Sequence, residues 1–143
     1  MSADPRVRSA TLDDLPFVRD DCRSYLPVNV LAEMFGRGDL VVAEQDGRPI
    51  GYAALDRLGA VFPYLAGIWV IEPFRRRGVG RALLAELEGR ARARGHAVLY
   101  SSSTADEAAP QAWHRRVGFV ECGFVAGLNP GGVGEVLFRR PLS

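Results

Sequence analysis

The chain has 143 residues, of which 48% are hydrophobic and 24% are charged. This length and composition are those of one globular domain that can bury a core without disulfides or a bound metal. Eighteen Lys and Arg residues against seventeen Asp and Glu leave a net charge of +1, which excludes an overall electrostatic attraction to nucleic acid or to an anionic membrane. We therefore expect a single domain over residues 1–143.

Cysteine usage and the N-terminus point to a cytoplasmic protein. Cys22 and Cys122 are far apart and form no CxxC pattern, which predicts two buried, unpaired thiols and no metal site. The first residues are polar and lack the apolar core of a signal peptide. The longest uncharged run, which ends at Ile71, is shorter than the roughly 20 residues that span a bilayer, so we expect no membrane partner.

The first half of the chain alternates between strand and helix patterns. Its predicted elements, in chain order, are a short strand around Val7, a helix that begins after the N-cap Thr11, a helix over 27–37, a hairpin of strands 39–44 and 50–56, and a strand over 63–71. Asp46 and Gly47 supply the turn of the hairpin. Because the strand over 63–71 is apolar throughout, we expect it to be central and buried on both faces.

The second half of the chain continues the alternation. Its predicted elements, in chain order, are a helix over 80–94, a strand over 97–100, a polar loop over 101–104, a short helix over 108–116, and strands over 119–125 and 133–138. Leu83 and Leu87 mark the buried face of the first helix, and Gly95 ends it. Helices in this order must cover a mixed sheet, which predicts an α/β or α+β fold.

The segment from Val70 to Arg81 joins a predicted strand to a predicted helix and is rich in arginine and glycine. Gly78 and Gly80 let the backbone turn sharply and approach a ligand closely. The first N–H groups of the helix lack internal partners and lie at the positive end of the helix dipole. Four arginines occupy the same segment, at positions 75, 76, 77 and 81. This combination predicts a site for a phosphorylated ligand.

Other phosphate-binding motifs do not fit this segment. A Walker A loop needs a lysine that is absent here, and the dinucleotide-binding GxGxxG lacks its third glycine. The plainer alternative is that Gly78 and Gly80 only make a tight turn and that the arginines only keep it solvated.

Three segments of the chain resemble the GNAT superfamily of N-acetyltransferases. They are Arg75-x-x-Gly78-x-Gly80, which is similar to the family motif (Q/R)-x-x-G-x-(G/A), the preceding Ile68-Trp69-Val70, and the later run Trp113-His114-Arg115-Arg116-Val117-Gly118-Phe119.

The resemblance implies a mixed, splayed β-sheet flanked by about four helices, with acetyl-CoA in the opening between the strands 63–71 and 97–100. Backbone N–H groups of the arginine-rich turn would hold the pyrophosphate, and the pantetheine arm would pair with the end of the first strand as an added strand does. The residues implied to bind acetyl-CoA are Ile68, Trp69, Val70, Arg75, Arg76, Arg77, Gly78, Val79, Gly80 and Arg81.

The catalytic residues are less fully indicated. His114 occupies the position where the family often has a tyrosine proton donor, so the resemblance implies that a neutral imidazole donates to the departing thiolate. The alternative is that His114 packs against, or caps, the helix end. The general base stays open among Glu33, Asp56, Glu72 and a chain of waters. Tyr64 either packs in its strand or contacts the substrate.

These observations favour an enzyme that transfers acetyl from acetyl-CoA to a primary amine in a ternary complex. The acceptor would be a small molecule or a protein N-terminus or lysine, and a homodimer is left open. The alternative function is a non-catalytic acyl-CoA-binding sensor of the same fold. A nucleic-acid binder that uses Arg75 to Arg94 is disfavoured, because no aromatic residues alternate with those arginines.

Overall fold

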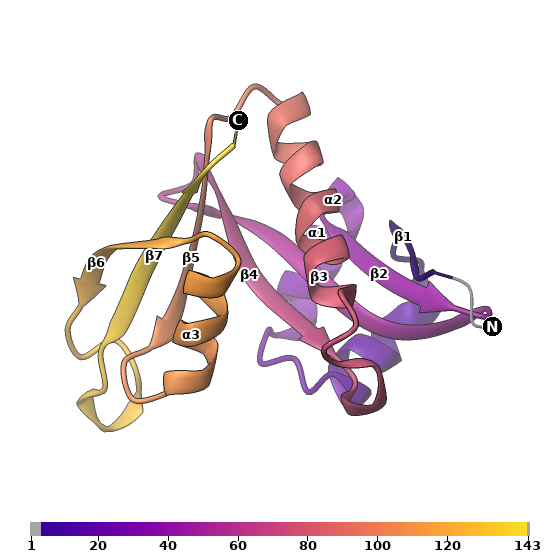
Figure 1. Cartoon of the computed structure of the whole chain (residues 1–143), viewed down its shortest axis with the longest axis horizontal. Helices are drawn as coiled ribbons and strands as arrows, with labels where there is room; N and C mark the ends of the chain where they lie inside the picture. Colours follow the sequence, from indigo (N-terminus) through magenta and orange to yellow (C-terminus); the bar gives the residue numbers. More distant parts are fainter. Residues whose placement is uncertain (1–3, 143) are drawn as a thin grey trace. The chain divides into compact units, whose positions relative to one another are not determined.

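The structure is a computed structural model that describes residues 4–142. Its strands and longer helices are β1 (Arg6–Ser9), α1 (Val28–Arg37), β2 (Leu40–Gln45), β3 (Arg48–Leu58), β4 (Phe62–Val70), α2 (Val79–Ala93), β5 (Val98–Thr104), α3 (Ala108–Arg116), β6 (Val120–Val125) and β7 (Glu135–Pro141). Figure 1 labels them. Short helical turns are η1 (Leu12–Asp14), η2 (Phe17–Asp21), η3 (Glu72–Phe74) and η4 (Pro130–Gly132).

The described strands form one mixed sheet in the order β1-β2-β3-β4-β5-β7-β6. The pairs β1–β2, β2–β3, β5–β7 and β6–β7 are antiparallel, whereas β4 and β5 run parallel. The parallel ladder joins Tyr64 to Tyr100 and Leu65 to Ser101. The expected fold class, a mixed sheet flanked by helices, is confirmed.

The chain divides into two compact units. The first comprises the chain up to Asp56 together with Ala66–Arg90, and the second comprises Arg57–Leu65 together with the chain from Ala91 onward. Strand β4 therefore contributes residues to both. The expectation of one domain over 1–143 stays a prediction, and residues 1–3 and 143 of that span lie outside the described residues.

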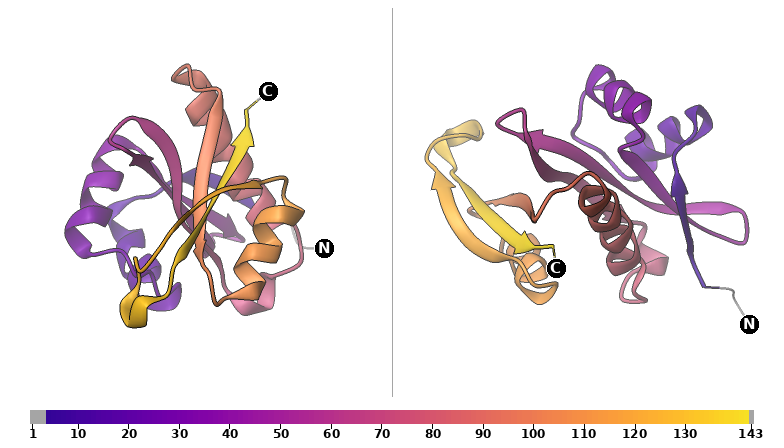
Figure 2. Two further views of the ribbon diagram at one scale, coloured as in Figure 1. Left: turned by 90° about the vertical axis from the view of Figure 1, so that its left-hand side faces the viewer. Right: turned by 90° about the horizontal axis from the view of Figure 1, so that it is seen from above.

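The first unit buries both faces of its strands. On one face, Leu40 and Val42 of β2 pack in a cluster with Met34 of α1. Alternate residues of a strand face opposite sides, so the fully buried Val41 belongs to the other face, as does Leu83 of α2, which lies next to Gly51 of β3. Figure 2 (right) shows α1 and α2 on opposite sides of these strands.

Most predicted elements are confirmed within a few residues. This holds for β1, α1, the β2–β3 hairpin, α2, α3 and β6. Strand β7 begins and ends slightly later than expected, at Glu135 and Pro141. In the part of the chain that the structure describes, no helix is long and apolar enough to cross a membrane.

The helix predicted after Thr11 forms, but it is irregular: the 3-10 turn η1 is followed by Leu15 and Pro16 in the right-handed helical conformation and then by the π-helical turn η2. Pro16 has no N–H to donate to Leu12, which interrupts the helical ladder between them. At the start of this segment, the Asp14 carboxylate accepts hydrogen bonds from Thr11 N and Arg8 Nη1, both at 2.7 Å. Burial acts to raise the pKa of Asp14, but the bonds from Arg8 and Thr11 outweigh it and hold this pKa below its usual value.

The polar loop predicted after Tyr100 is wrong, because β5 continues through Thr104. Polar residues are costly inside a sheet unless they are hydrogen-bonded. Ser101 and Ser103, which are buried, both bond to a histidine of α3. Side-chain partners outside the strand therefore allow serines to continue it.

Two expectations about burial need correction. Strand β4 is buried in its middle but not throughout, since Trp69 is 36% exposed and Phe62 is 52% exposed. These two residues lie near the ends of the strand, where Arg75 covers Trp69 and Tyr100 meets Phe62 edge-on. Cys22 is buried as expected, whereas Cys122 is exposed because it lies on β6, the last strand in the sheet order.

We expect Gly51→Ala to destabilise the fold. A Cβ at this position would lie 2.8 Å from the Trp69 backbone oxygen and 3.3 Å from Leu83 Cδ1. Because that oxygen belongs to the backbone of β4, two strands must move to accept the methyl group. Overpacking of this kind costs about 1–3 kcal/mol of unfolding free energy, which urea denaturation measures.

Gly89→Ala is the matched control. Gly89 lies inside α2, and no atom outside its local helix backbone stands within 4 Å of the position that a Cβ would take. Alanine should stabilise this helix by roughly 0.5–1 kcal/mol. Equal effects of the two substitutions would contradict the close approach of β3 to β4 at Gly51.

Candidate functional site

Strand β4 passes into α2 through a segment that we call the arginine loop, residues 70–81. The turn η3 begins it, with Phe74 N–H donating to Ile71 O at 3.0 Å. The helix α2 then starts at Val79, and the carbonyl of the preceding Gly78 accepts from Ala82 N at 3.0 Å. Val79, which is 2% exposed, anchors this start in the core. The first N–H groups of α2 therefore lie at the end of the loop, without carbonyls one turn upstream.

The backbone of the arginine loop is left-handed at two places. Gly78 has φ 83°, which suits glycine, but Arg76 has φ 63°. A residue with a Cβ pays about 1–2 kcal/mol for that conformation. Such strain persists where surrounding structure enforces it, and it is frequent at binding sites. The sequence pattern had not indicated that Arg76 adopts it.

The arginines of the loop have different surroundings. Arg75 turns back on the strand, because its Nε donates to Val70 O at 2.7 Å and its guanidinium lies 4.7 Å from the centre of the Trp69 ring. Arg77 lies 5.6 Å from the Phe74 ring centre. The side chains of Arg76, Arg77 and Arg81 are exposed. The loop thus combines one arginine that braces the strand end with several that can meet a ligand.

The end of β4 presents backbone groups in alternating directions. Ile71 N–H donates to Ile50 O of β3 at 2.9 Å. Backbone groups of successive strand residues point to opposite edges, so those of Trp69 also face β3 and those of Ile68 and Val70 face away from it. The backbone groups of Ile68 and Val70 are thus oriented for pairing with an added extended chain. The Val70 carbonyl already accepts a hydrogen bond from Arg75 Nε.

His114 lies in the core of the second unit. Its ring is 5% exposed and stacks on Phe138, with ring centres 4.7 Å apart. Nδ1 is 2.8 Å from Pro110 O and 3.0 Å from Ser103 Oγ, and Nε2 is 2.7 Å from Ser101 Oγ. Both ring nitrogens are therefore engaged by groups of the protein itself.

The hydrogen bonds of His114 fix how its protons are placed. Pro110 O only accepts, so Nδ1 carries a proton, and Nε2 of the neutral ring is an acceptor. The single Ser101 hydroxyl proton is then divided between Nε2, at 2.7 Å, and Leu65 O, at 3.1 Å. Burial lowers the pKa of His114, although the Pro110 bond and the charge of Glu135 oppose this. The ring is neutral at pH 7.

The proton-donor role of His114 stays a prediction. The ring would have to exchange its bond with Ser101 or Pro110 for one with a thiolate. The candidate bases also stay predictions: Asp56 forms an ion pair with Arg37 at 3.5 Å, while Glu33 and Glu72 are exposed.

A second polar cluster was missed by the sequence reasoning. Ser102 Oγ donates to Glu135 Oε2 at 2.5 Å, Asn129 Nδ2 donates to Glu135 Oε1 at 2.9 Å, and Tyr64 Oη bonds to Ser102 Oγ. All four residues are partly buried. The available signal was a lone carboxylate, Glu135, at the start of an apolar strand, but nothing in the sequence linked it to β5.

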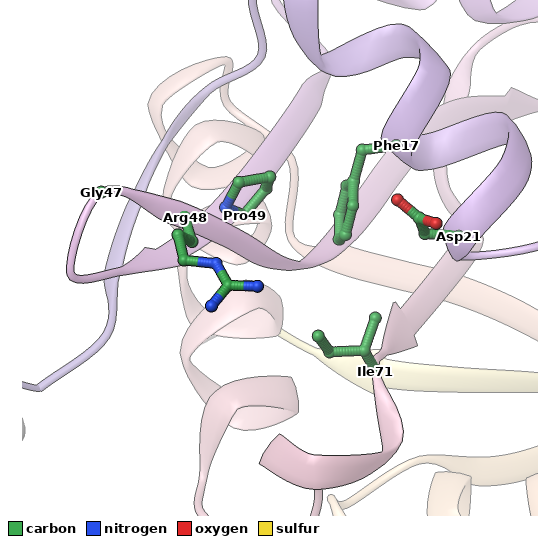
Figure 3. A pocket seen from close by; sticks show the side chains of 6 residues that line it. All are labelled: Phe17, Asp21, Gly47, Arg48, Pro49 and Ile71. Atoms are coloured by element: carbon green, nitrogen blue, oxygen red, sulfur yellow. The ribbon is translucent and has the colours of Figure 1, made fainter.

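A pocket of about 470 Å³ lies in the first unit. Its lining comes from η2, from the β2–β3 hairpin and from the chain that leaves β4: Phe17, Asp21, Gly47, Arg48, Pro49 and Ile71. Figure 3 shows the Phe17 ring beside the Asp21 carboxylate on η2. None of the residues predicted from the sequence to bind acetyl-CoA or to take part in catalysis lines this pocket.

Comparison with known protein families gives one match. The profile of the Acetyltransferase (GNAT) family matches residues 5–119, which include the arginine loop and His114. No curated protein sequence matched the chain.

Several solved structures share the fold. The ribosomal-protein-S18-alanine N-acetyltransferase of Escherichia coli is 24% identical, with a TM-score of 0.79 over 98% of this chain and 95% of that one. The ribosomal-protein-alanine N-acetyltransferase of Brucella melitensis is 27% identical, with a TM-score of 0.72 over 95% of this chain and 99% of that one. The N-acetylglutamate synthase of Neisseria gonorrhoeae, solved with coenzyme A and N-acetyl-glutamate, is 22% identical. Its TM-score is 0.80 over 99% of this chain and 36% of that one.

We expect His114→Phe to lower the melting temperature. Phenylalanine keeps a ring to stack on Phe138 but leaves the Pro110 carbonyl without its side-chain donor and removes a partner of Ser101. A buried polar group left without a partner costs about 1–3 kcal/mol. The same variant tests proton donation, because loss of a general acid lowers kcat roughly 10²–10⁴-fold. A kcat within about twofold of the parent, well short of that effect, would assign His114 to the core alone.

Stability should also depend on pH through His114. Its pKa is lowered by burial, so below pH of about 6.5 the unfolded chain binds a proton that the folded chain does not. The stability due to the neutral ring is present above that pH and is lost as pH falls below it. We expect the melting temperature to fall less between pH 7 and 5 in His114→Phe than in the parent. Equal falls in melting temperature in the two proteins would contradict the lowered pKa of His114.

Proposed function

Since the chain belongs to the Acetyltransferase (GNAT) family, we propose that it transfers an acetyl group from acetyl-CoA to a primary amine. The arginine loop is the observation that carries the proposal. It joins the end of a strand to a buried helix start and exposes arginine residues there, among them Arg76, Arg77 and Arg81. A helix N-terminus with surrounding guanidinium groups suits a pyrophosphate.

The residues of β4 and the loop fit the rest of acetyl-CoA. The backbone of Ile68 and Val70 is directed away from β3, where an extended amide chain such as pantetheine can pair with it. A backbone N–H in the same stretch is suited to bond the thioester oxygen as negative charge develops there. Bound acetyl-CoA supplies an activated acetyl group, and the chain's own residues hold it and manage protons.

The acceptor class rests on the relatives and on the chemistry of the transfer. The Brucella melitensis relative is, by its name, a ribosomal-protein-alanine N-acetyltransferase, which supports a protein N-terminal amine as one acceptor. Small-molecule amines and lysine side chains share the same reacting group. All of these are largely protonated at neutral pH when their pKa is ordinary, so the enzyme must remove a proton before the nitrogen can attack.

The proposal is tested by thiol release from acetyl-CoA over a panel of amines that includes an alanine-terminated peptide, lysine and spermidine. An acetyltransferase releases CoA thiol faster with at least one of them than without any. A protein that binds acetyl-CoA but releases no thiol with any amine would instead be an acyl-CoA sensor.

We expect Gly80→Asp to abolish binding of CoA while the protein stays folded. Gly80 lies in the first turn of α2, where a carboxylate stabilises a helix. The same carboxylate would occupy and repel the place that a phosphate must reach. The measurement is the rise in melting temperature on addition of CoA. A rise equal to that of the parent would show that the phosphates bind elsewhere.

We expect the double variant Arg76→Ala/Arg77→Ala to raise KM for acetyl-CoA with little change in kcat. Contacts to the phosphates are the same in the ground state and the transition state, so their loss affects binding alone. The matched control is Arg92→Ala/Arg94→Ala, which removes the same charge from the other end of α2 and its exit. An equal rise in KM for both pairs would point to net charge rather than to the loop.

A further inference from the structure

We propose that the pocket lined by η2, the β2–β3 hairpin and Ile71 binds an elongated zwitterion, a small molecule with an ammonium and a carboxylate at opposite ends of an aliphatic chain. The volume of the pocket, about 470 Å³, lies within the range of small-molecule sites in proteins. All of its lining residues belong to the first unit. The inference concerns a second site and does not depend on the proposed acetyl transfer.

The walls of the pocket carry opposite charges. Asp21 of η2 supplies a carboxylate, and Arg48 at the start of β3 supplies a guanidinium. Figure 3 shows these two groups on either side of the Phe17 ring. Both residues are exposed, and among the described residues neither side chain has an ion-pair or hydrogen-bond partner. Both charged groups are therefore available to a ligand.

The backbone holds the two charged residues on their separate walls. The π-helical turn η2 sets Asp21 beside the Phe17 ring, as Figure 3 shows, and π-helical turns are rare and frequent at functional sites. On the other wall, Asp46 and Gly47 have φ of 52° and 77°. Two positive φ values in succession are typical of the tight turn that joins closely paired strands, and Arg48 follows this turn directly.

The part of the pocket between the charged groups is apolar. The side chains of Phe17, Pro49 and Ile71 line it, are partly buried and have no hydrogen-bonding groups. A hydrocarbon chain gives up no hydrogen bonds when it lies against them, whereas a peptide or hydroxyl group without a partner is costly to bury. We therefore expect the middle of the ligand to be aliphatic.

Opposite charges on the two walls select against singly charged ligands. An amine meets its complement at Asp21 but brings a positive charge towards Arg48, and a carboxylic acid does the reverse. An uncharged ligand pairs with neither residue. A molecule with both charges, spaced by the length of its chain, meets each wall with the complementary group.

The ammonium of such a ligand is not a nucleophile for acetyl transfer. A carboxylate close to an ammonium favours its charged form, and a protonated nitrogen has no free electron pair with which to attack a thioester. An ion pair with Asp21 therefore keeps the ligand unreactive. We assign the pocket to a ligand other than the amine acceptor.

The test is an NMR titration of the isotope-labelled full chain at pH 7, without acetyl-CoA. The probes are ε-aminocaproate, hexylamine, hexanoate and L-norleucine, which have the same number of carbon atoms. Hexylamine and hexanoate each keep one of the two charges, and L-norleucine carries both on one carbon. We expect ε-aminocaproate to shift the amide signals of Gly47 and Ile71 and to bind tightest, because each exposed ion pair improves Kd by roughly 1.5- to 5-fold.

The probes separate the parts of the proposal. Equal affinity for hexylamine or hexanoate would show that the site does not select a zwitterion. Equal affinity for L-norleucine would overturn the placement of the charges at the two ends of the ligand. If no probe shifts a signal at millimolar concentration, the site itself is wrong.

Two variants give a crossed test of the walls. Asp21→Asn should lose the preference for ε-aminocaproate over hexanoate, and Arg48→Gln should lose the preference over hexylamine. The matched controls are Asp20→Asn and Arg19→Gln, which change the same charges on η2 at an exposed ion pair of 3.2 Å outside the pocket lining, and they should bind as the parent does. An unchanged melting temperature without ligand shows that each variant is folded.

The outcome is independent of the acetyltransferase assays. If both pocket variants keep the preferences of the parent, the zwitterion site is wrong, and acetyl transfer is unaffected. If the parent releases thiol with no amine but binds ε-aminocaproate with the crossed pattern, the proposed function fails and the site stands.

Discussion

Hydrogen bonding of the serines in β5 is the constraint on which the second unit depends. This strand lies between β4 and β7 in the sheet, and unpaired hydroxyls at such a place are costly. Ser101 and Ser103 are satisfied by His114, and Ser102 by Glu135. Helix α3 and strand β7 are therefore held to β5 by polar contacts as well as by the stacking of His114 on Phe138.

The same contacts give the unit its chemical character. A neutral, buried imidazole lies on one side of β5, and a carboxylate bonded by a serine and an amide lies on the other. The environments differ because burial in a stacked, apolar setting lowers the pKa of His114, whereas Glu135 is partly buried and receives hydrogen bonds from Ser102 and Asn129.

In the first unit, the arginine loop, which is the proposed phosphate site, combines exposed arginines with local backbone strain. Arg76 is held at φ 63°, between a strand end braced by Arg75 and a helix start anchored by Val79. The enforced turn brings arginine side chains and the first N–H groups of α2 to one point.

Contiguous residues encoded much of the fold and part of the site. The residues of the apolar strand, of the Arg75-x-x-Gly78-x-Gly80 turn and of the leucine-bearing helix face each lie close together in the sequence, so the order of elements could be predicted. The phosphate-binding role of the loop stays a prediction. Turn types and helix periodicity are local properties of the backbone, and local properties can be deduced from sequence.

The partners of polar side chains were decided only by the tertiary structure. Ser102 bonds to a carboxylate 33 residues away, and Ser101 bonds to a histidine 13 residues away. A run of serines predicts a loop until such partners are known, and a lone His114 predicts either a donor or a core residue with equal ease. Whether a hydroxyl, an imidazole or a carboxylate is buried depends on what the rest of the chain brings within hydrogen-bonding distance, and neighbours in sequence do not determine that.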